Sequence, residues 1–397
     1  MSSKIFTIAV VLLPILSVYI SPINGIDLGT FCLLLLLPVL LGGILKCNKI
    51  KMKLPLSMLL LILYISFGSL ISYVISIPPN FVLVLSRMGK FIIVLLIVFI
   101  IGKGQYFDYQ LAKRILKITV LAAVSYIIIQ SVMFYMSGRL LPSVPFNLIR
   151  SEEYANIDYL RGASVFYRPT SFFLEPAHFA QYVIVYLIYS LFGDYKENQT
   201  KLKIAVFITV GLFLSTSGQG ILLSLLVWGF WLFSQLIKSS IDRKIKLVIL
   251  GVLVCTIVLP AVFQTEILST SIDRVITNSG SLGAATEGRL FSYDYFNDLP
   301  MLQKIIGTGY GNVPAGVYLN SVAYTLYCNG IIGMLFVGML FYDAFVHTRY
   351  YHKYLCIIYA LLIFGSSTFT ASGIAFYFMF IYSGYIKDRT FGRIQSQ

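Results

Sequence analysis

Charged residues, and acidic residues above all, are scarce in this sequence. Only 12% of its 397 residues are charged and 58% are hydrophobic, whereas soluble domains have roughly 25% charged and about 45–50% apolar residues. This composition excludes a soluble globular protein. The net charge of +14 comes from basic residues in short connectors between apolar runs. Membrane topology explains that charge better than nucleic acid binding does, so no nucleic acid partner is expected.

Sequence motifs for metal, nucleotide and hydrolase chemistry are also missing. The five cysteines show no CxxC or CxxxC spacing, which argues against a zinc site or a disulfide framework. No HExxH, DxD, P-loop or GxSxG pattern occurs. The second, eighth and ninth apolar runs have no acidic residue, where an ion-coupled transporter would need a proton relay. We expect no cofactor and no metal site.

Long apolar runs recur through the whole chain. A transmembrane helix needs about 20 predominantly apolar residues to cross roughly 30 Å of hydrocarbon. Twelve runs approximate this length: 5–20, 29–45, 54–76, 81–102, 115–136, 177–192, 202–216, 220–237, 246–263, 320–345, 354–368 and 370–386. We therefore expect an all-α polytopic membrane protein, a single integral membrane domain over 1–397 with about 12 transmembrane helices.

Two breaks between these runs are ambiguous. The stretch from Ser215 to Gly220 is polar and contains glycine, so it fits either a tight turn or an unwound segment within the membrane. The turn near Ser366 to Ser372 has the same ambiguity.

The distribution of lysine and arginine predicts the orientation. A cytoplasmic N-terminus places 21 of the 30 basic residues on the cytoplasmic side and seven on the outer side, as the positive-inside rule requires. Both termini are then cytoplasmic. The first run has no small-x-small cleavage site after it and is expected to be retained. Two outer loops are long, 137–176 and 264–319, and we expect these large extracytoplasmic loops to carry the soluble chemistry.

Arginine dominates the basic residues of the two outer loops. The positive-inside rule does not distinguish arginine from lysine. Arginine on the outer face, where positive charge is disfavoured, therefore suggests planar, bidentate recognition of anions. The alternative is ion pairing that holds the loops together, with Glu152, Glu153, Asp158, Glu287 or Asp294 as partners. The six arginines are Arg139, Arg150, Arg161, Arg168, Arg274 and Arg289.

The end of the first outer loop concentrates ionisable side chains. Arg168, Glu175 and His178 stand at the outer start of the sixth apolar run, and ionisable residues at membrane depth are functional candidates because their desolvation is costly. Arg168 fits an anionic leaving group, and Glu175 or His178 fits a base that takes a proton from a hydroxyl. The alternative is an interfacial Arg168–Glu175 pair followed by a helical turn after Pro176.

The second outer loop contains an expected short helix over 288–298. Arg289, Tyr293 and Phe296 would share one face of it, and Asp294 and Asp298 another. A cation beside aromatic rings suits a sugar next to a phosphate, although an interfacial helix anchored by aromatics has the same pattern. The following Gly307-Thr-Gly-Tyr-Gly-Asn312 has backbone amides that can approach an anion closely, but its spacing excludes a dinucleotide-binding site.

Taken together, these stretches resemble the O-antigen and capsule repeat-unit polymerases (Wzy-like) of the O-antigen ligase superfamily. The likeness rests on the dozen spans with two large outer loops and on four stretches. They are Arg168-Pro-Thr-Ser-Phe-Phe-Leu-Glu175-Pro-Ala-His178, Ser215-Thr-Ser-Gly-Gln-Gly220, Gly288-Arg289 leading to Gly307-Thr-Gly-Tyr-Gly-Asn312, and Asn320 followed by Asn329-Gly330-Ile-Ile-Gly333.

The resemblance implies a GT-C-like membrane glycosyltransferase of the bacterial inner membrane. It would move a growing glycan from undecaprenyl pyrophosphate onto a lipid-linked repeat unit on the outer face, without a metal. Its partners would be undecaprenyl-pyrophosphate-linked oligosaccharides, membrane lipids and a protein that regulates chain length. The site residues it implies are Glu175, His178 and Arg289 as catalytic, and Arg168, Arg161, Tyr293, Asp294 and Asn320 as substrate-binding.

Several alternatives remain open: a ligase, a transporter, a glycosyltransferase that uses polyprenyl phosphate sugars, and a purely structural membrane protein. The ligases of the same superfamily typically carry a histidine where this chain has Leu319, immediately before Asn320, which favours a polymerase. A flippase or another transporter of lipid-linked sugars would have short loops on both faces, and the two long outer loops argue against it.

Overall fold

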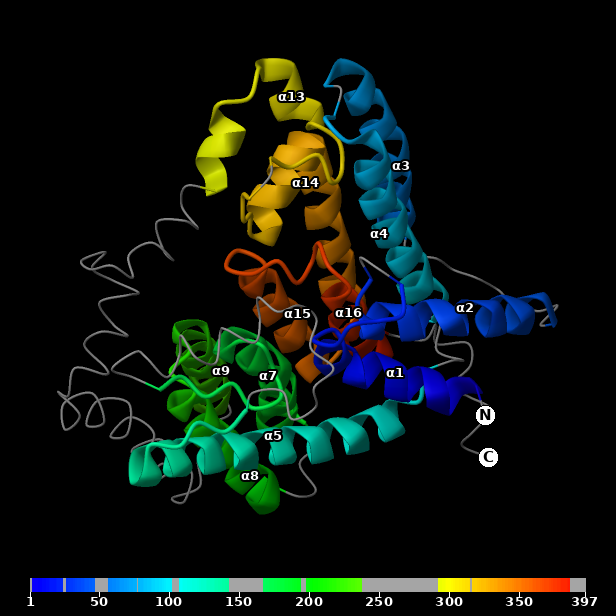
Figure 1. Cartoon of the computed structure of the whole chain (residues 1–397). Coiled ribbons are helices and arrows are strands. Elements are labelled where there is room, and N and C mark those ends of the chain that lie inside the picture. Colours follow the sequence, from blue (N-terminus) through cyan, green and yellow to red (C-terminus); the bar gives the residue numbers. More distant parts are fainter. Residues whose placement is uncertain are drawn as a thin grey trace. The chain divides into compact units, whose positions relative to one another are not determined.

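The described part of the chain is helical. The computed structural model describes residues 2–23, 26–46, 56–76, 78–101, 107–142, 167–193, 198–237, 292–314 and 316–385. Regular structure in these ranges is helical, apart from isolated β-bridges such as Thr348 with Tyr385, which confirms the all-α prediction for them. The helices (Figure 1) are α1 (Ser2–Leu16), α2 (Leu28–Lys46), α3 (Leu56–Ile75), α4 (Phe81–Ile101), α5 (Tyr109–Ser137), α7 (Pro176–Phe192), α8 (Asn198–Leu214), α9 (Gly218–Ile237), α13 (Met301–Ile306), α14 (Ser321–His347), α15 (Tyr351–Leu362) and α16 (Gly373–Ser383).

Several of these helices are suited to a membrane. Five stretches are long and apolar enough to cross one: Leu56–Ile75, Phe81–Ile100, Tyr109–Ser137, Gly218–Gln235 and Ser321–His347. Others are shorter, and α16 with its 11 residues extends only about 16 Å at roughly 1.5 Å per residue. The long apolar helices indicate a multi-pass membrane protein. The number of twelve spans stays a prediction, and the predicted run 246–263 lies outside the described residues.

The structure resolves both ambiguous breaks. Helix α8 ends at Leu214 and α9 begins at Gly218, and the two helices contact each other. Between them Thr216 has a φ of 50°, so this break is a tight turn. The second break, residues 363–372, is a longer non-helical segment. The carbonyl of Ser366 accepts hydrogen bonds from the amide (2.8 Å) and the hydroxyl (2.6 Å) of Ser321, which fixes this segment to the start of α14.

The chain forms two compact units. The first combines Met1–Ser17, Ile23–Ile115 and Phe291–Gln397, and the second combines Val18–Pro22 and Leu116–Leu290. In the first unit α14 packs against α3, α13 and α15, while α16 packs against α1 and α4. In the second, α7 packs against α8 and α9. The prediction of a single integral membrane domain stays a prediction.

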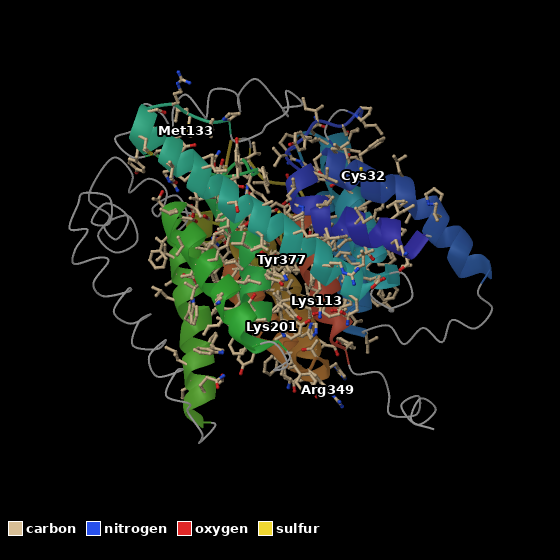
Figure 2. All side chains as sticks on the ribbon, turned by 90° about the horizontal axis from the view of Figure 1, so that it is seen from below. Cys32, Lys113, Met133, Lys201, Arg349 and Tyr377 are labelled. Atoms are coloured by element: carbon tan, nitrogen blue, oxygen red, sulfur yellow. The ribbon has the colours of Figure 1, made fainter. Side chains whose placement is uncertain are left out.

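Aromatic side chains fill the core of the first unit around α15 and α16. Tyr377, labelled in Figure 2, stacks on Tyr359 with 4.1 Å between ring centroids, and Phe378 meets Tyr359 edge to face at 5.8 Å. Phe341 of α14 lies 5.7 Å from Phe378. Each such pair contributes about 0.5–1.5 kcal/mol beyond the area it buries, so this cluster joins α14, α15 and α16.

Candidate functional site

The segment that leads into α7 is fixed on α5 by hydrogen bonds. Ser171 has a φ of 55° and is fully buried. Its amide donates to Oε1 of Gln130 (2.9 Å), and its hydroxyl donates to the carbonyl of Ala123 (2.9 Å). Nε2 of Gln130 donates in turn to the carbonyl of Pro142 (3.3 Å). Because buried polar groups are costly unless paired, these bonds hold the segment in one conformation.

Stacked rings fix the same segment on both sides of Arg168. Tyr167 stacks on Phe134 of α5 with centroids 4.7 Å apart, and Phe172 stacks on Tyr126 of α5 at 5.2 Å. Arg168 itself is half-buried, and its Nε atom is buried. The segment is therefore a rigid support, as a binding or catalytic site requires.

Glu175 and His178 lie at the end of this support. Glu175 is the N-cap residue of α7, but its side chain makes no capping hydrogen bond, and it is exposed. His178 is exposed on the first turn, three residues later, where its side chain is a neighbour of the N-cap side chain. Pro176 at the first helical position begins the helix, which confirms the predicted helical turn.

The alternative of an Arg168–Glu175 ion pair is not what the structure shows. Within the described ranges the ion pair that forms joins His347 to Asp343, and Glu175 pairs with no described residue. An exposed carboxylate that neither caps its helix nor pairs with any cation in the described ranges is available to a ligand.

The turn between α8 and α9 packs against α7 at the residues that follow His178. Nε2 of Gln181 donates to Oε1 of Gln219 (3.0 Å). A Cβ atom on Gly220 would lie 2.7 Å from Cβ of Ala180, closer than real side chains approach, so glycine is required there. Two stretches that the sequence singled out, 168–178 and 215–220, therefore belong to one packed unit.

The remaining predicted residues are placed as follows. Arg161 and Arg289 lie outside the described residues. Residues 292–297 are helical, with Tyr293 half-buried and Asp294 exposed, which confirms the short helix over that part. Tyr293, Asp294 and Asn320 belong to the first unit, and Arg168, Glu175 and His178 belong to the second.

Asn320 is the N-cap of α14. Its Oδ1 accepts a hydrogen bond from the amide of Ala323 (2.9 Å), the arrangement that N-cap asparagines favour. The side chain is fully buried, and its Nδ2 atom has no hydrogen-bond partner among the residues that the structure describes. Burying an unsatisfied donor costs about 1–3 kcal/mol. Asn320 therefore stabilises the start of α14 through its acceptor oxygen, and its donor is not used by the described residues.

The prediction that the amides of 307–312 bind an anion is wrong. The amide of Thr308 donates to the carbonyl of Tyr327 (3.0 Å), that of Gly309 to Cys328 (2.8 Å) and that of Tyr310 to Oγ of Ser69 (3.0 Å). These donors are used within the protein, because the loop packs against α3 and α14.

The glycines of this loop allow its backbone to touch α14. Gly307 has a φ of 86°, and a Cβ there would lie 2.2 Å from the carbonyl oxygen of Cys328. Gly330, with a φ of 65°, kinks α14 at the same place, and a Cβ on it would lie 2.3 Å from the oxygen of Ile305. The hydroxyl of Tyr64 donates to the carbonyl of Asn329 (2.8 Å). The glycine-rich pattern thus encodes close packing of backbones.

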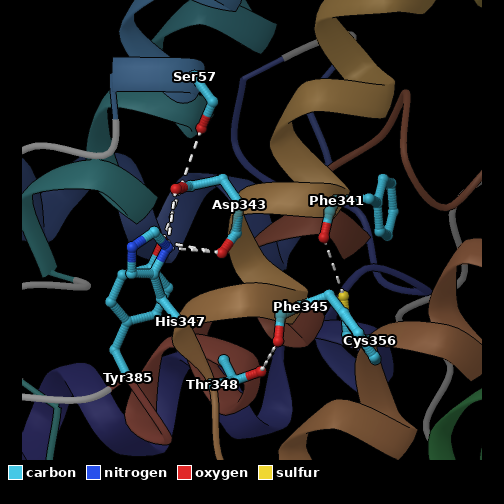
Figure 3. A network of polar contacts seen from close by, with 8 residues as sticks. All are labelled: Ser57, Phe341, Asp343, Phe345, His347, Thr348, Cys356 and Tyr385. Carbon is cyan, nitrogen blue, oxygen red and sulfur yellow. Dashed lines mark hydrogen bonds and ion pairs between the residues drawn. The ribbon is translucent and has the colours of Figure 1, made fainter.

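A polar network lies at the opposite end of α14. Asp343 accepts hydrogen bonds from Ser57 (3.1 Å) and Tyr385 (2.6 Å) and pairs with His347 (3.0 Å), as Figure 3 shows. It links α14 to the start of α3 and to the residues that follow α16. Among the described residues no group of three or more His, Cys, Asp or Glu side chains is arranged to hold a metal ion.

Comparison with known protein families and with curated proteins assigns no family to the chain. No protein-family model matches it, and no curated protein matches it. The function is therefore inferred from the residues and their geometry.

Proposed function

We propose that this protein is a polysaccharide polymerase of the O-antigen and capsule type. It transfers a growing glycan from undecaprenyl pyrophosphate onto a lipid-linked repeat unit, without a metal, on the outer face of a bacterial inner membrane. The observation that carries the proposal is the pair Glu175 and His178. Both are exposed at the start of α7, Glu175 as its N-cap residue and His178 on its first turn, next to a segment that hydrogen bonds and stacked rings hold in place.

The reaction requires one proton acceptor. An acceptor hydroxyl of the repeat unit attacks the anomeric carbon of the donor sugar, the bond between that carbon and the pyrophosphate oxygen breaks, and the pyrophosphate leaves with the electron pair. Glu175, with His178 beside it, takes the proton of the attacking hydroxyl, a role that typically contributes about 10²–10⁴ in rate. Neither a redox step nor a cofactor is needed.

The leaving group requires cations. Pyrophosphate departs readily when its charge is neutralised, and arginine neutralises it through paired N–H donors in a planar fork. Arg168, Arg161 and Arg289 are proposed for this role. Tyr293 and Asp294 are proposed to bind the sugars of the repeat unit, whereas Asn320, predicted for the same role, is fully buried and caps α14. A rigid support such as the one beneath Arg168 favours in-line transfer because both substrates are held in position.

The proposed topology has about 12 spans, two large outer loops and both termini in the cytoplasm. It follows from the distribution of basic residues and is compatible with the long apolar helices. It would place the start of α7 on the side where flipped, lipid-linked glycans are found. A protein that regulates chain length is a proposed partner.

The proposal is tested in cells of the source organism in which the chromosomal gene is replaced by variants. Glu175→Gln is expected to abolish long chains and to accumulate single repeat units, while folded protein stays in the membrane. His178→Gln is compared with His347→Gln, a matched change of another exposed histidine that lies in the Asp343 network. Normal chain lengths from both Glu175→Gln and His178→Gln would contradict the proposal.

The same cells distinguish the alternatives. Loss of a ligase would leave long polymer on its lipid carrier, and loss of a flippase would leave repeat units on the cytoplasmic leaflet. The polymerase proposal requires single units on the outer leaflet.

A further inference from the structure

Helix α4 carries two cations within a membrane-spanning stretch. Phe81–Ile100 has a mean hydropathy of 2.4, yet it contains Arg87 and Lys90 and no acidic residue. Arg87 lies six residues after Phe81, about 9 Å along the helix at roughly 1.5 Å per residue. Charged side chains at such depth are costly and usually mark a functional site.

Among the described residues, Arg87 has one hydrogen-bond partner, a backbone carbonyl. Its Nη1 donates to the oxygen of Gly311 at 3.1 Å, and the side chain is exposed. A guanidinium has five N–H donors, so the other donors are free of described residues. The described ion pair, Asp343 with His347, lies elsewhere in the unit, so no described carboxylate neutralises Arg87.

The glycine loop holds Arg87 in place. Gly311 has a φ of 85°, and a Cβ there would lie 3.0 Å from Cβ of Arg87, so glycine lets the loop approach α4 closely. The neighbouring Tyr310 stacks on Phe91 of α4 with centroids 4.7 Å apart, and its carbonyl accepts a hydrogen bond from the hydroxyl of Tyr73. The anchoring carbonyl is thereby fixed, which gives the guanidinium a defined position.

We infer that Arg87, with Lys90, binds the pyrophosphate of a polyprenyl lipid that reaches α4 from the bilayer. This inference rests on the proposed function and adds a second cationic site to the outer-loop arginines. Lys90 is half-buried and lies three residues after Arg87, on the same helix face. A pyrophosphate carries more than one negative charge and suits two cations, whereas a phospholipid phosphodiester carries one.

The alternative is that Arg87 extends toward the membrane surface and binds any phospholipid headgroup, as long basic side chains do. The two sources of phosphate differ in selectivity. A headgroup anchor binds phosphatidylglycerol as well as a polyprenyl pyrophosphate, and a soluble-anion site binds inorganic pyrophosphate without a lipid tail.

The test is lipid binding by the full-length protein in phosphatidylcholine nanodiscs, with bound lipid counted by native mass spectrometry. Undecaprenyl pyrophosphate, phosphatidylglycerol and inorganic pyrophosphate are titrated separately. Arg87→Gln is expected to weaken binding of undecaprenyl pyrophosphate by about tenfold or more, the typical value of charge-assisted hydrogen bonds, with little change for phosphatidylglycerol. Arg349→Gln is the matched control, because Arg349 (labelled in Figure 2) is an exposed arginine of the same unit, beyond the other end of α14.

Four outcomes overturn the inference. They are unchanged binding in Arg87→Gln, an equal loss in Arg349→Gln, an equal loss for phosphatidylglycerol, and equally tight binding of inorganic pyrophosphate. Should Arg87→Gln not fold, Arg87→Lys keeps the charge but removes the planar fork and is expected to lose most of the same affinity.

Failure of the inference and failure of the proposed function are distinguishable. Wild-type protein that binds undecaprenyl pyrophosphate with Arg87→Gln unaffected removes only the α4 site. Wild-type protein that binds no undecaprenyl pyrophosphate removes both.

Discussion

Replacing Gly309 by alanine tests the packing of the glycine loop. Gly309 has a φ of 94°, and a Cβ there would lie 2.1 Å from Cε1 of Tyr73. The left-handed backbone costs an alanine roughly 1–2 kcal/mol, and overpacking typically costs about 1–3 kcal/mol. Displacing Tyr73 also breaks its hydrogen bond to Tyr310, worth about 1 kcal/mol. We expect Gly309→Ala to lose about 3–6 kcal/mol.

Gly316→Ala is the matched control for this loss. Gly316 also has a positive φ, 75°, but a Cβ on it would meet no atom within 4 Å, so only the backbone cost of roughly 1–2 kcal/mol applies. The assay is the thermal unfolding of both variants in detergent. Replacing Tyr73 by leucine in the Gly309→Ala background should recover part of the loss, because the two sites contact each other and are not additive. Equal melting temperatures for Gly309→Ala and Gly316→Ala would refute the reasoning.

Three further predictions concern stability and topology. Burial lowers the pKa of His352, which precedes the predicted span 354–368, to about 4. In the unfolded chain His352 has its ordinary pKa near 6.5. Its contribution to stability is therefore complete above pH 6.5, and the free energy of unfolding falls by roughly 2 kcal/mol as the pH is lowered to 5. The melting temperature of wild type should fall over this pH range. That of His352→Asn should depend less on pH. Asn320→Ala should lose about 1 kcal/mol of capping, while Asn320→Ser keeps an acceptor and should be as stable as wild type, again by thermal unfolding. Single cysteines at positions 143 and 281, in a cysteine-free background, should react with a reagent added outside the cell; reaction only from the cytoplasm would invert the topology.

Hydrophobic pattern predicted the helices well because spanning segments need long apolar runs. The runs at 81–102 and 177–192 correspond closely to α4 and to α7. It could not predict that the break at 363–372 is a segment fixed by Ser321 to the start of α14. That contact joins residues 45 positions apart, and periodicity reports only on neighbours along the chain.

The candidate site was predictable in residue type and less so in geometry. The stretch from Arg168 to His178 could be identified because ionisable residues at membrane depth are rare. Its attachment to α5 through Gln130 and Ser171 has no sequence signal. The glycines at 307–311 suggested an anion site, yet a glycine pattern does not distinguish an open backbone from one packed against another, as here against Cys328.

Arg87 shows the same limit. In the sequence it is one of two basic residues in an apolar run, and counting charges for topology gives it no role. Its hydrogen bond to the carbonyl of Gly311 joins residues more than 200 positions apart. Only the fold therefore reveals that the guanidinium is held in place without an acidic partner among the described residues.

The most direct measurement of the central claim is polymerisation by the purified protein. Full-length protein is reconstituted in liposomes with lipid-linked repeat units extracted from the source organism, in the presence of EDTA, and the products are separated by length. We predict a ladder of lipid-linked glycans for wild type that is lost with Glu175→Gln. A ladder that appears only after magnesium is added would contradict the metal-independent mechanism, and the absence of any ladder with and without magnesium would contradict the proposed function itself.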